Sequence, residues 1–125
     1  MNNVYHTDGY CSRNGSKSAI GGFTIFKNGE FILTKEIEKV GVTSNECELQ
    51  ALLYAVVDAE EGDKIVTDSN VVVFWTRSGK PKARKDLTRD CTLAKQLIEE
   101  KNLDVYWAPR EENQAGIYNE ESFGL

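Results

Sequence analysis

Residues 43–51 read TSNECELQA, and at this stretch the chain changes from a strand pattern to a helix pattern. Thr43 is a residue type that caps helices, and Glu46 three positions later completes the pattern of a capping box. Apolar residues then recur at helical spacing, at Leu49, Leu52, Leu53 and Val56. The sequence therefore predicts a helix that begins after Thr43 and ends near Gly62.

The residues before this helix predict three strands joined by short turns. The expected strands are residues 4–11, 18–26 and 30–37, which are rich in aromatic and β-branched side chains. Asn28-Gly29 is a hairpin signal between the second and third strands, and the Gly21-Gly22 pair predicts a bulge in the second. Tight connections between successive strands favour an antiparallel meander.

The residues after Gly62 alternate between strand and helix. We expect short strands at residues 65–67 and 105–107, a helix at 87–101 that buries Leu93, Leu97 and Ile98, and a short final helix at about 113–121. Residues 69–75 fit either a strand or a helix. Because strands that alternate with helices pair in parallel through right-handed crossovers, the sequence predicts one α/β domain over residues 1–125 with a mixed sheet.

Composition excludes several classes of protein. A chain of 125 residues with 40% hydrophobic and 28% charged residues is typical of one soluble domain. Apolar runs are far shorter than the roughly 20 residues that span a bilayer, and the polar start lacks a signal-peptide core, so we expect no membrane association and a cytoplasmic location. Three dispersed cysteines and a single histidine, His6, make a disulfide framework or a zinc site improbable.

Charge is distributed unevenly along the chain. The formal net charge is −5, but residues 77–89 contain six bases and one acid, so that segment is +5 and the remainder −10. Such asymmetry can create a phosphate-binding patch on an acidic body. A solubilising loop would explain the segment equally well.

Three acids stand out by position. Asp8 lies inside a predicted strand, where Asp is disfavoured. Asp68 follows a predicted parallel strand, at the edge where open α/β sheets carry their sites. Glu48 lies one turn into the first helix, beside its apolar face. Singly, each acid could be a cap or a solvated charge; together on one fold, they predict a carboxylate cluster.

A cluster of carboxylates has specific chemistry. Neighbouring carboxylates raise one another's pKa values, so a compensating cation is expected, and hard oxygen ligands select Mg²⁺ or Mn²⁺. Two such ions about 3.5–4 Å apart can activate water and stabilise a leaving oxygen in phosphodiester cleavage.

Four fragments, in order along almost the whole chain, resemble the ribonuclease H type I family. They are residues 4–9 (VYHTDG), 43–51 (TSNECELQA), 67–69 (TDS) and 107–115 (WAPREENQA). The second is similar to the family's Thr-Asn-Asn-x-x-Glu-Leu-x-Ala helix start, and that register makes Glu48 the ligand and Glu46 a cap. Each fragment is weak evidence alone, whereas four at the family's spacing are strong.

The resemblance implies a ribonuclease H-like fold, a five-stranded mixed sheet in order 3-2-1-4-5 with helices on both faces. It also implies metal-dependent cleavage of the RNA strand of RNA/DNA hybrids, with Asp8 bridging two ions and Glu48 and Asp68 on the leaving-group side. Glu48 and the Gly9 backbone would contact RNA 2′-hydroxyls. The resemblance also implies groove contacts for Asn14, Ser44, Asn45 and Asn70, although turn and cap chemistry would explain Ser44 and Asn45 equally well. The family's long basic protrusion is missing, and Lys82, Arg84 and Lys85 of the short basic segment could fill part of its role in binding nucleic acid.

One departure from the family pattern affects catalysis. The family has a fourth carboxylate, an Asp after an Asn-x-Ala stretch, and this sequence has Gly116 there. Glu120, four residues on, could substitute as a ligand; three carboxylates could suffice at higher metal concentration; or catalysis could be lost. The loop at 108–112 also lacks the histidine of many relatives, and His6 is read as a structural strand residue.

Three hypotheses follow. The first is an active ribonuclease H that needs Mg²⁺ or Mn²⁺, and the second is a weak or inactive module that binds nucleic acid through the same groove. The third is a DNA-cleaving nuclease of the same fold. Gly116 favours the second hypothesis, and the three retained acids favour the first. The tryptophans, Trp75 and Trp107, are expected to pack in the core, and the oligomeric state stays open.

Overall fold

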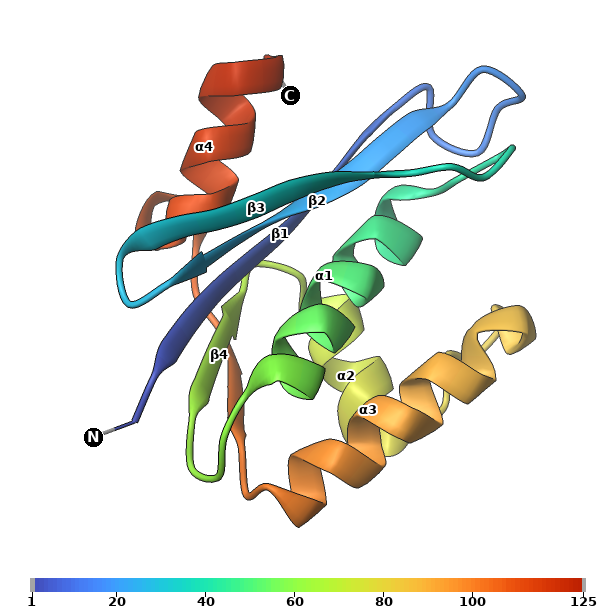
Figure 1. Cartoon of the computed structure of the whole chain (residues 1–125). Helices are drawn as coiled ribbons and strands as arrows, with labels where there is room; N and C mark the ends of the chain where they lie inside the picture. The colour runs from blue at the N-terminus through green and yellow to red at the C-terminus, as the bar shows by residue number, and fades with distance from the viewer. Residues whose placement is uncertain (1, 125) are drawn as a thin grey trace.

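The structure is a computed structural model that describes residues 2–124, and its centre is a five-stranded sheet in the order β3-β2-β1-β4-β5 (Figure 1). The strands are β1 (Val4–Ser12), β2 (Ile20–Lys27), β3 (Glu30–Ile37), β4 (Lys64–Thr67) and β5 (Asp104–Trp107). β1, β2 and β3 form an antiparallel meander, while β4 pairs in parallel with both β1 and β5. The expected mixed sheet and strand order are confirmed.

Helices cover both faces of this sheet, as expected. The α-helices are α1 (Ser44–Asp58), α2 (Asn70–Ser78), α3 (Thr88–Glu100) and α4 (Gln114–Phe123), and short 3₁₀ turns cover Lys85–Leu87 and Arg110–Glu112. Figure 1 shows α1, α2 and α3 on one side of the sheet and α4 alone on the other, across β1 and β2. None of the helices in residues 2–124 has the length and apolar character to cross a membrane.

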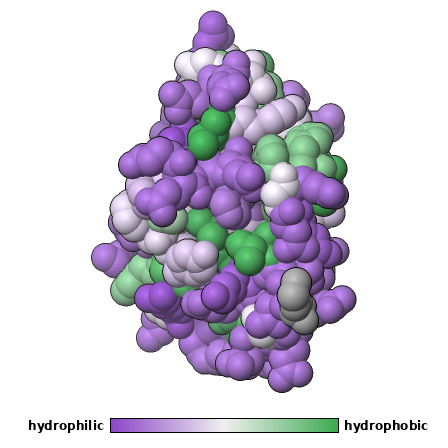
Figure 2. All heavy atoms as spheres, turned by 90° about the vertical axis from the view of Figure 1, so that its left-hand side faces the viewer, coloured by the Kyte–Doolittle hydropathy of each residue, from purple (hydrophilic) through white to green (hydrophobic). Residues whose placement is uncertain are grey.

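The main core lies between the sheet and α1. Tyr5 and Ile25 from the strands and Leu49, Leu52 and Val56 from α1 are all at most 1% exposed. The predicted apolar face of α1 is therefore the buried one, and Thr43 caps the helix by accepting a hydrogen bond from the Glu46 N–H. The opposite side of the molecule, the α4 side, is mostly hydrophilic in Figure 2, with small separate apolar areas.

The structure settles one ambiguity and corrects three expectations. Residues 70–78 form a helix, capped by Ser69, although their valine run also fits a strand. The expected bulge at Gly21-Gly22 is wrong, because both glycines pair regularly and the register shift falls between Ile25 and Phe26. These glycines instead allow close packing, since a Cβ on Gly22 would lie 2.3 Å from the Lys35 carbonyl oxygen.

Two side chains expected in the core are exposed. Leu93 is 41% exposed, and α3 buries Cys91 and Ala94 in its place. Trp75 is buried as expected, but Trp107 is 46% exposed and donates its Nε1–H to the carbonyl oxygen of Asp68 at 3.0 Å. Trp107, the last residue of β5, therefore contacts the backbone of Asp68, a predicted site residue that follows β4.

Candidate active site: a three-carboxylate cluster

Two of the predicted acids lie where neighbouring parallel strands stop pairing. Thr7 and Thr67 are the last residue pair between β1 and β4. Asp8 follows Thr7 along β1, and Asp68 follows Thr67 just beyond the end of β4. Because β4 ends at Thr67, no strand pairs with β1 on the β4 side of Asp8. The Asp8 and Asp68 carboxylates lie next to each other at this end of the β1–β4 pair.

The third acid reaches the cluster because Gly9 lets a helix approach β1 closely. A Cβ on Gly9 would lie 2.4 Å from the Glu48 backbone nitrogen and 2.5 Å from the Cys47 carbonyl carbon. Side chains at position 9 are therefore excluded by the backbone of α1. The Gly9 N–H donates to Glu48 Oε1 at 2.6 Å, which aims the carboxylate at the sheet.

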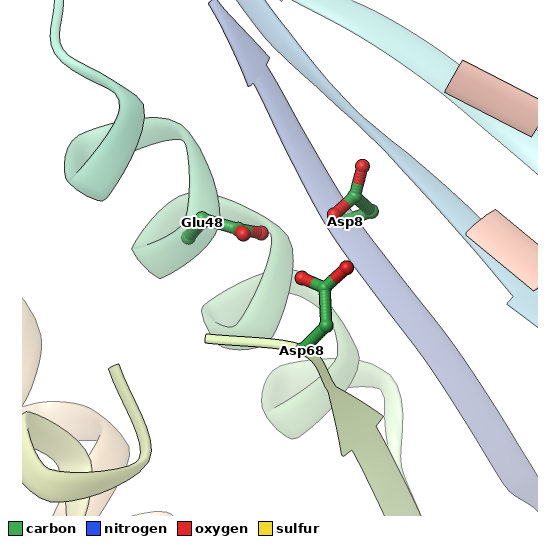
Figure 3. Close-up of side chains that lie close together, drawn as sticks. All are labelled: Asp8, Glu48 and Asp68. Atoms are coloured by element: carbon green, nitrogen blue, oxygen red, sulfur yellow. The ribbon is translucent and has the colours of Figure 1, made fainter. Parts of the chain in front are cut away.

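Figure 3 shows the carboxylates of Asp8, Glu48 and Asp68 pointing toward one another from β1, α1 and the end of β4. One oxygen from each lies within 4.8 Å of the others. Burial, and then the charge of Asp68, raises the pKa of Asp8 to about 7. Burial, and then the charges of Asp8 and Asp68, raises the pKa of Glu48 well above its usual range. The three predicted acids are thus brought together at an electrostatic cost.

The cluster has the features of a divalent-cation site. Asp8 is 1% exposed, and its Oδ1 is buried without a hydrogen-bond partner among residues 2–124. A buried anionic oxygen without a donor is costly unless a cation compensates it. Three converging carboxylates supply the hard oxygen ligands that Mg²⁺ and Mn²⁺ prefer, so these residues fit such an ion.

Two buried asparagines that sequence reasoning missed hold the cluster in place. Asn119 of α4 donates to Asp8 Oδ2 at 2.9 Å, and its own Oδ1 accepts from Thr24 Oγ1 at 2.5 Å. Asn113 caps α4 by accepting from the Ala115 and Gly116 N–H groups and donates to the Thr7 carbonyl oxygen at 2.9 Å. The two residues are six positions apart near a predicted helix, and that spacing does not indicate that either side chain contacts β1 or β2.

Arg110 is a further site residue that the sequence did not indicate. Its Nε donates to Asp68 Oδ2 at 2.7 Å, and its NH2 lies 3.8 Å from Asp8 Oδ1. Glu120, considered above as a substitute ligand, lies outside the group of three and has Oε2 3.8 Å from Arg110 NH1. Gly116 is buried in α4, directly beside the Arg110 side chain and Asp68.

The residues predicted to bind nucleic acid in the groove differ in exposure and in the hydrogen bonds they already make. Asn45 and Asn70 are exposed at the starts of α1 and α2. Asn14 is exposed but its Oδ1 accepts from the Ser44 N–H at 2.8 Å, so its side chain satisfies the first N–H of α1. The Gly9 N–H is held by Glu48, so Gly9 and Glu48 form one polar edge.

Of the three predicted basic residues, one is engaged in contacts within the protein and two are exposed. Arg84 pairs with Glu46 and Asp86, both at 2.9 Å, and donates to Thr43 Oγ1, which ties the basic segment to the start of α1. Lys82 and Lys85 are exposed, and the Lys82 ammonium lies 5.2 Å from the centre of the Phe74 ring. Arg84 is thus engaged within the protein, while the two lysines face solvent.

The chain matches a known protein family over nearly its full length. The RNase H family model matches residues 2–118, and the chain therefore belongs to the RNase H family, whose members depend on divalent metal ions. Sequences of curated proteins gave no match.

Similar solved structures share this fold at low identity. RNase H1 from the halophilic archaeon Halobacterium salinarum is 20% identical, with a TM-score of 0.70 and 100% coverage of both chains. The N-terminal RNase H domain of a Mycobacterium tuberculosis protein is 20% identical, with a TM-score of 0.69, coverage of 97% of this chain and 89% of that one. LC11-RNase H1, isolated from compost and crystallised with an RNA/DNA hybrid, is 20% identical, with a TM-score of 0.65 and coverage of 90% and 88%.

Proposed function

We propose that this protein is a metal-dependent endoribonuclease that cleaves the RNA strand of RNA/DNA hybrids. The observation that carries the proposal is the convergence of Asp8, Glu48 and Asp68 within 4.8 Å on a chain of the RNase H family. Three mutually repelling acids, one buried and two partly buried, do not stabilise a fold, so their retention favours catalysis over simple binding.

Asp8, Glu48 and Asp68 would hold Mg²⁺ or Mn²⁺. When bound, two such ions would activate a water and stabilise the leaving oxygen of the scissile phosphodiester. Asn119 fixes one Asp8 oxygen, so the other, Oδ1, is directed into the cluster and left for the metal. The buried position of Asp8 also excludes bulk water from one side of the site, which strengthens the electrostatic interactions within it.

Selection of RNA over DNA would depend on the Gly9–Glu48 edge. The Gly9 N–H holds the Glu48 carboxylate at 2.6 Å, and this carboxylate can accept a hydrogen bond from a 2′-hydroxyl, which DNA lacks. Exposed Asn45 and Asn70 would contact the groove, and Lys82 and Lys85 the phosphates. The hybrid bound in the LC11-RNase H1 crystal structure supports this substrate class.

The test compares four end-labelled substrates of the same sequence: an RNA/DNA hybrid, single-stranded RNA, duplex RNA and duplex DNA. Each is incubated with the protein in Mg²⁺, Mn²⁺ or EDTA, and with the Asp8→Asn variant as the matched control. We expect cleavage of the hybrid RNA strand alone, leaving 3′-hydroxyl and 5′-phosphate ends, with no cleavage in EDTA or by the variant. Cleavage of duplex DNA, or cleavage that survives Asp8→Asn, would contradict the proposal.

A second candidate is a module that binds hybrids without cleaving them, and Gly116 is the observation that favours it. The position that holds the family's fourth carboxylate has no side chain, so one ligand of the resemblance is missing. Binding of the hybrid without cleavage in either metal would establish this candidate in place of the first.

A further inference from the structure

The absence of a side chain at position 116 creates a space that another residue fills. A Cβ on Gly116 would lie 2.7 Å from Arg110 Cδ and 2.8 Å from Arg110 Nε, and 3.3 Å from Asp68 Oδ2. Real Cβ atoms do not approach other atoms so closely, so a side chain at position 116 and the observed Arg110 conformation exclude each other. The arginine therefore occupies the place that a carboxylate-bearing residue would need.

Arg110 uses this space to bring a positive charge to the cluster. The guanidinium donates to Asp68 Oδ2 at 2.7 Å, has NH2 3.8 Å from Asp8 Oδ1, and has NH1 3.8 Å from Glu120 Oε2. The side chain of Arg110 is 41% exposed, whereas those of Asp8 and Asp68 are 1% and 9% exposed. The guanidinium therefore lies on the solvent side of the two acids, which are both much less exposed than Arg110.

We propose that the Arg110 guanidinium is a resident cation that fills the side of the carboxylate cluster left open by Gly116, so that the protein without nucleic acid binds one divalent ion where a fourth carboxylate would support two. This inference rests on the proposed metal site. A fixed monovalent charge compensates Asp8 and Asp68 without needing a ligand at position 116. Arg110 is permanently protonated, so this compensation is present at every working pH.

The proposal distinguishes Arg110 from a purely structural arginine. A structural ion pair would stabilise the fold and leave metal binding unchanged or weaker after its removal. A resident cation opposes an incoming divalent ion through charge repulsion, so its removal makes the metal-free protein less stable and metal binding tighter. Only the proposal predicts that removing Arg110 both lowers the stability of the metal-free protein and tightens metal binding.

The first experiment measures Mn²⁺ binding by calorimetry, without nucleic acid, for the wild type, Arg110→Gln and Arg110→Lys. Arg89→Gln is the matched control, because it removes the same charge from an exposed position on α3. We expect Arg110→Gln to bind Mn²⁺ at least about fivefold more tightly and to melt at a lower temperature in EDTA, with Arg110→Lys and Arg89→Gln close to the wild type. Unchanged or weaker Mn²⁺ binding by Arg110→Gln would overturn the proposal.

The second experiment tests the link between the two positions with Gly116→Ala and Gly116→Asp. Alanine displaces the arginine without adding a ligand, so Mn²⁺ should bind more tightly but with the same stoichiometry of one ion per protein. Aspartate displaces the arginine and adds a carboxylate, so Mn²⁺ counted by electron paramagnetic resonance should rise to two ions per protein. If neither variant changes Mn²⁺ binding, position 116 does not govern the cluster and the proposal fails.

These outcomes are separable from the proposed function because none of them requires cleavage. One Mn²⁺ ion in the wild type and two in Gly116→Asp, with no hybrid cleavage by the wild type, would support the resident cation and reject the nuclease. Hybrid cleavage by the wild type together with unaltered Mn²⁺ binding by Arg110→Gln would support the nuclease and reject the resident cation.

Discussion

At the scale of single residues, Gly9 shows how one missing side chain builds the site. The backbone of α1 passes so close to β1 that a Cβ on Gly9 would lie 2.4 Å from the Glu48 nitrogen. Because the obstacle is backbone, neither a rotamer change nor a small side-chain shift relieves it. Glu48 reaches Asp8 and Asp68 only while this approach is preserved.

Gly9→Ala should therefore lower both stability and activity. We expect a loss of about 1–3 kcal/mol in the free energy of unfolding, which is typical of overpacking, measured by urea denaturation. Mg²⁺ binding should weaken as well, because α1 and Glu48 move away from the cluster. A variant with wild-type stability and wild-type Mg²⁺ affinity would show that α1 does not depend on the close approach.

Asp8→Asn should stabilise the metal-free protein. The replacement removes one of three repelling acids, and an amide placed at the buried Oδ1 position gains neighbouring carboxylate acceptors. In EDTA at pH 8 we expect a gain of at most about 4 kcal/mol, seen as a higher melting temperature, because a pKa raised from 3.8 to about 7 corresponds to a cost of that order. Most of the stabilisation by Mg²⁺ should vanish in the same variant. A lower melting temperature in EDTA would contradict the cluster picture.

At the scale of elements, α4 is attached to the active strand by Asn113. This buried side chain caps α4 and also donates to the Thr7 carbonyl oxygen, one residue before Asp8. A second link is Asn119, which joins the same helix to Asp8 itself. α4 therefore positions the Asp8 carboxylate, although it contributes no carboxylate to the group of three.

Asn113→Ala and Asn113→Asp separate the two roles of this residue. Aspartate can still accept from the Ala115 and Gly116 N–H groups but cannot donate to Thr7, whereas alanine can do neither. We expect alanine to cost about 2 kcal/mol or more and aspartate to cost at least as much, because its second carboxylate oxygen would be buried against the Thr7 carbonyl oxygen without a donor; both are measured by thermal unfolding. Equal, negligible effects would mean that α4 docks without this residue.

Element patterns in the sequence were informative where local chemistry decides the structure. The capping box at Thr43 and the apolar spacing of α1 predicted that helix correctly. Residues 70–78 stayed ambiguous because valines suit both strand and helix, and the Ser69 cap and packing of Val72 and Trp75 decide for helix. Gly21-Gly22 was misread as a bulge because a close approach between packed segments leaves the same glycine signal.

At the scale of the whole molecule, the strand order followed from the alternation of strands and helices together with the four family-like fragments. The positions of Asp8, Glu48 and Asp68 were predictable because each belongs to such a fragment. Arg110 was not, because its contacts with Asp68 and Asp8 span 42 and about a hundred residues and depend on the space beside Gly116. The spacing of residues along the sequence does not indicate which way the Arg110 side chain extends or which acids it contacts.

The pH dependence of stability is a property of the whole metal-free protein. A carboxyl whose pKa is raised from its ordinary 3.8 to about 7 costs nothing below the lower value and destabilises increasingly as pH rises to the upper one. Glu48 acts in the same direction. In EDTA, stability attributable to these acids should therefore fall between about pH 4 and 7 and level off above.

The measurement is chemical denaturation in EDTA at pH 5, 6, 7 and 8, for the wild type and for Asp8→Asn. His6 has a lowered pKa through burial and destabilises toward acid pH, but it does so equally in both proteins. The stability advantage of Asp8→Asn should thus be small at pH 5 and largest at pH 8. An advantage that is independent of pH would refute the assignment of the raised pKa.

The central claim is that three carboxylates suffice for catalysis in a chain with Gly116. The most direct measurement follows binding and cleavage of one labelled RNA/DNA hybrid in the same samples, over a range of Mg²⁺ and Mn²⁺ concentrations, for the wild type and Asp8→Asn. We predict that both proteins bind the hybrid and that only the wild type cleaves its RNA strand, with cleavage rising as metal is added. Hybrid bound by the wild type but uncut at every concentration of both metals would contradict the claim.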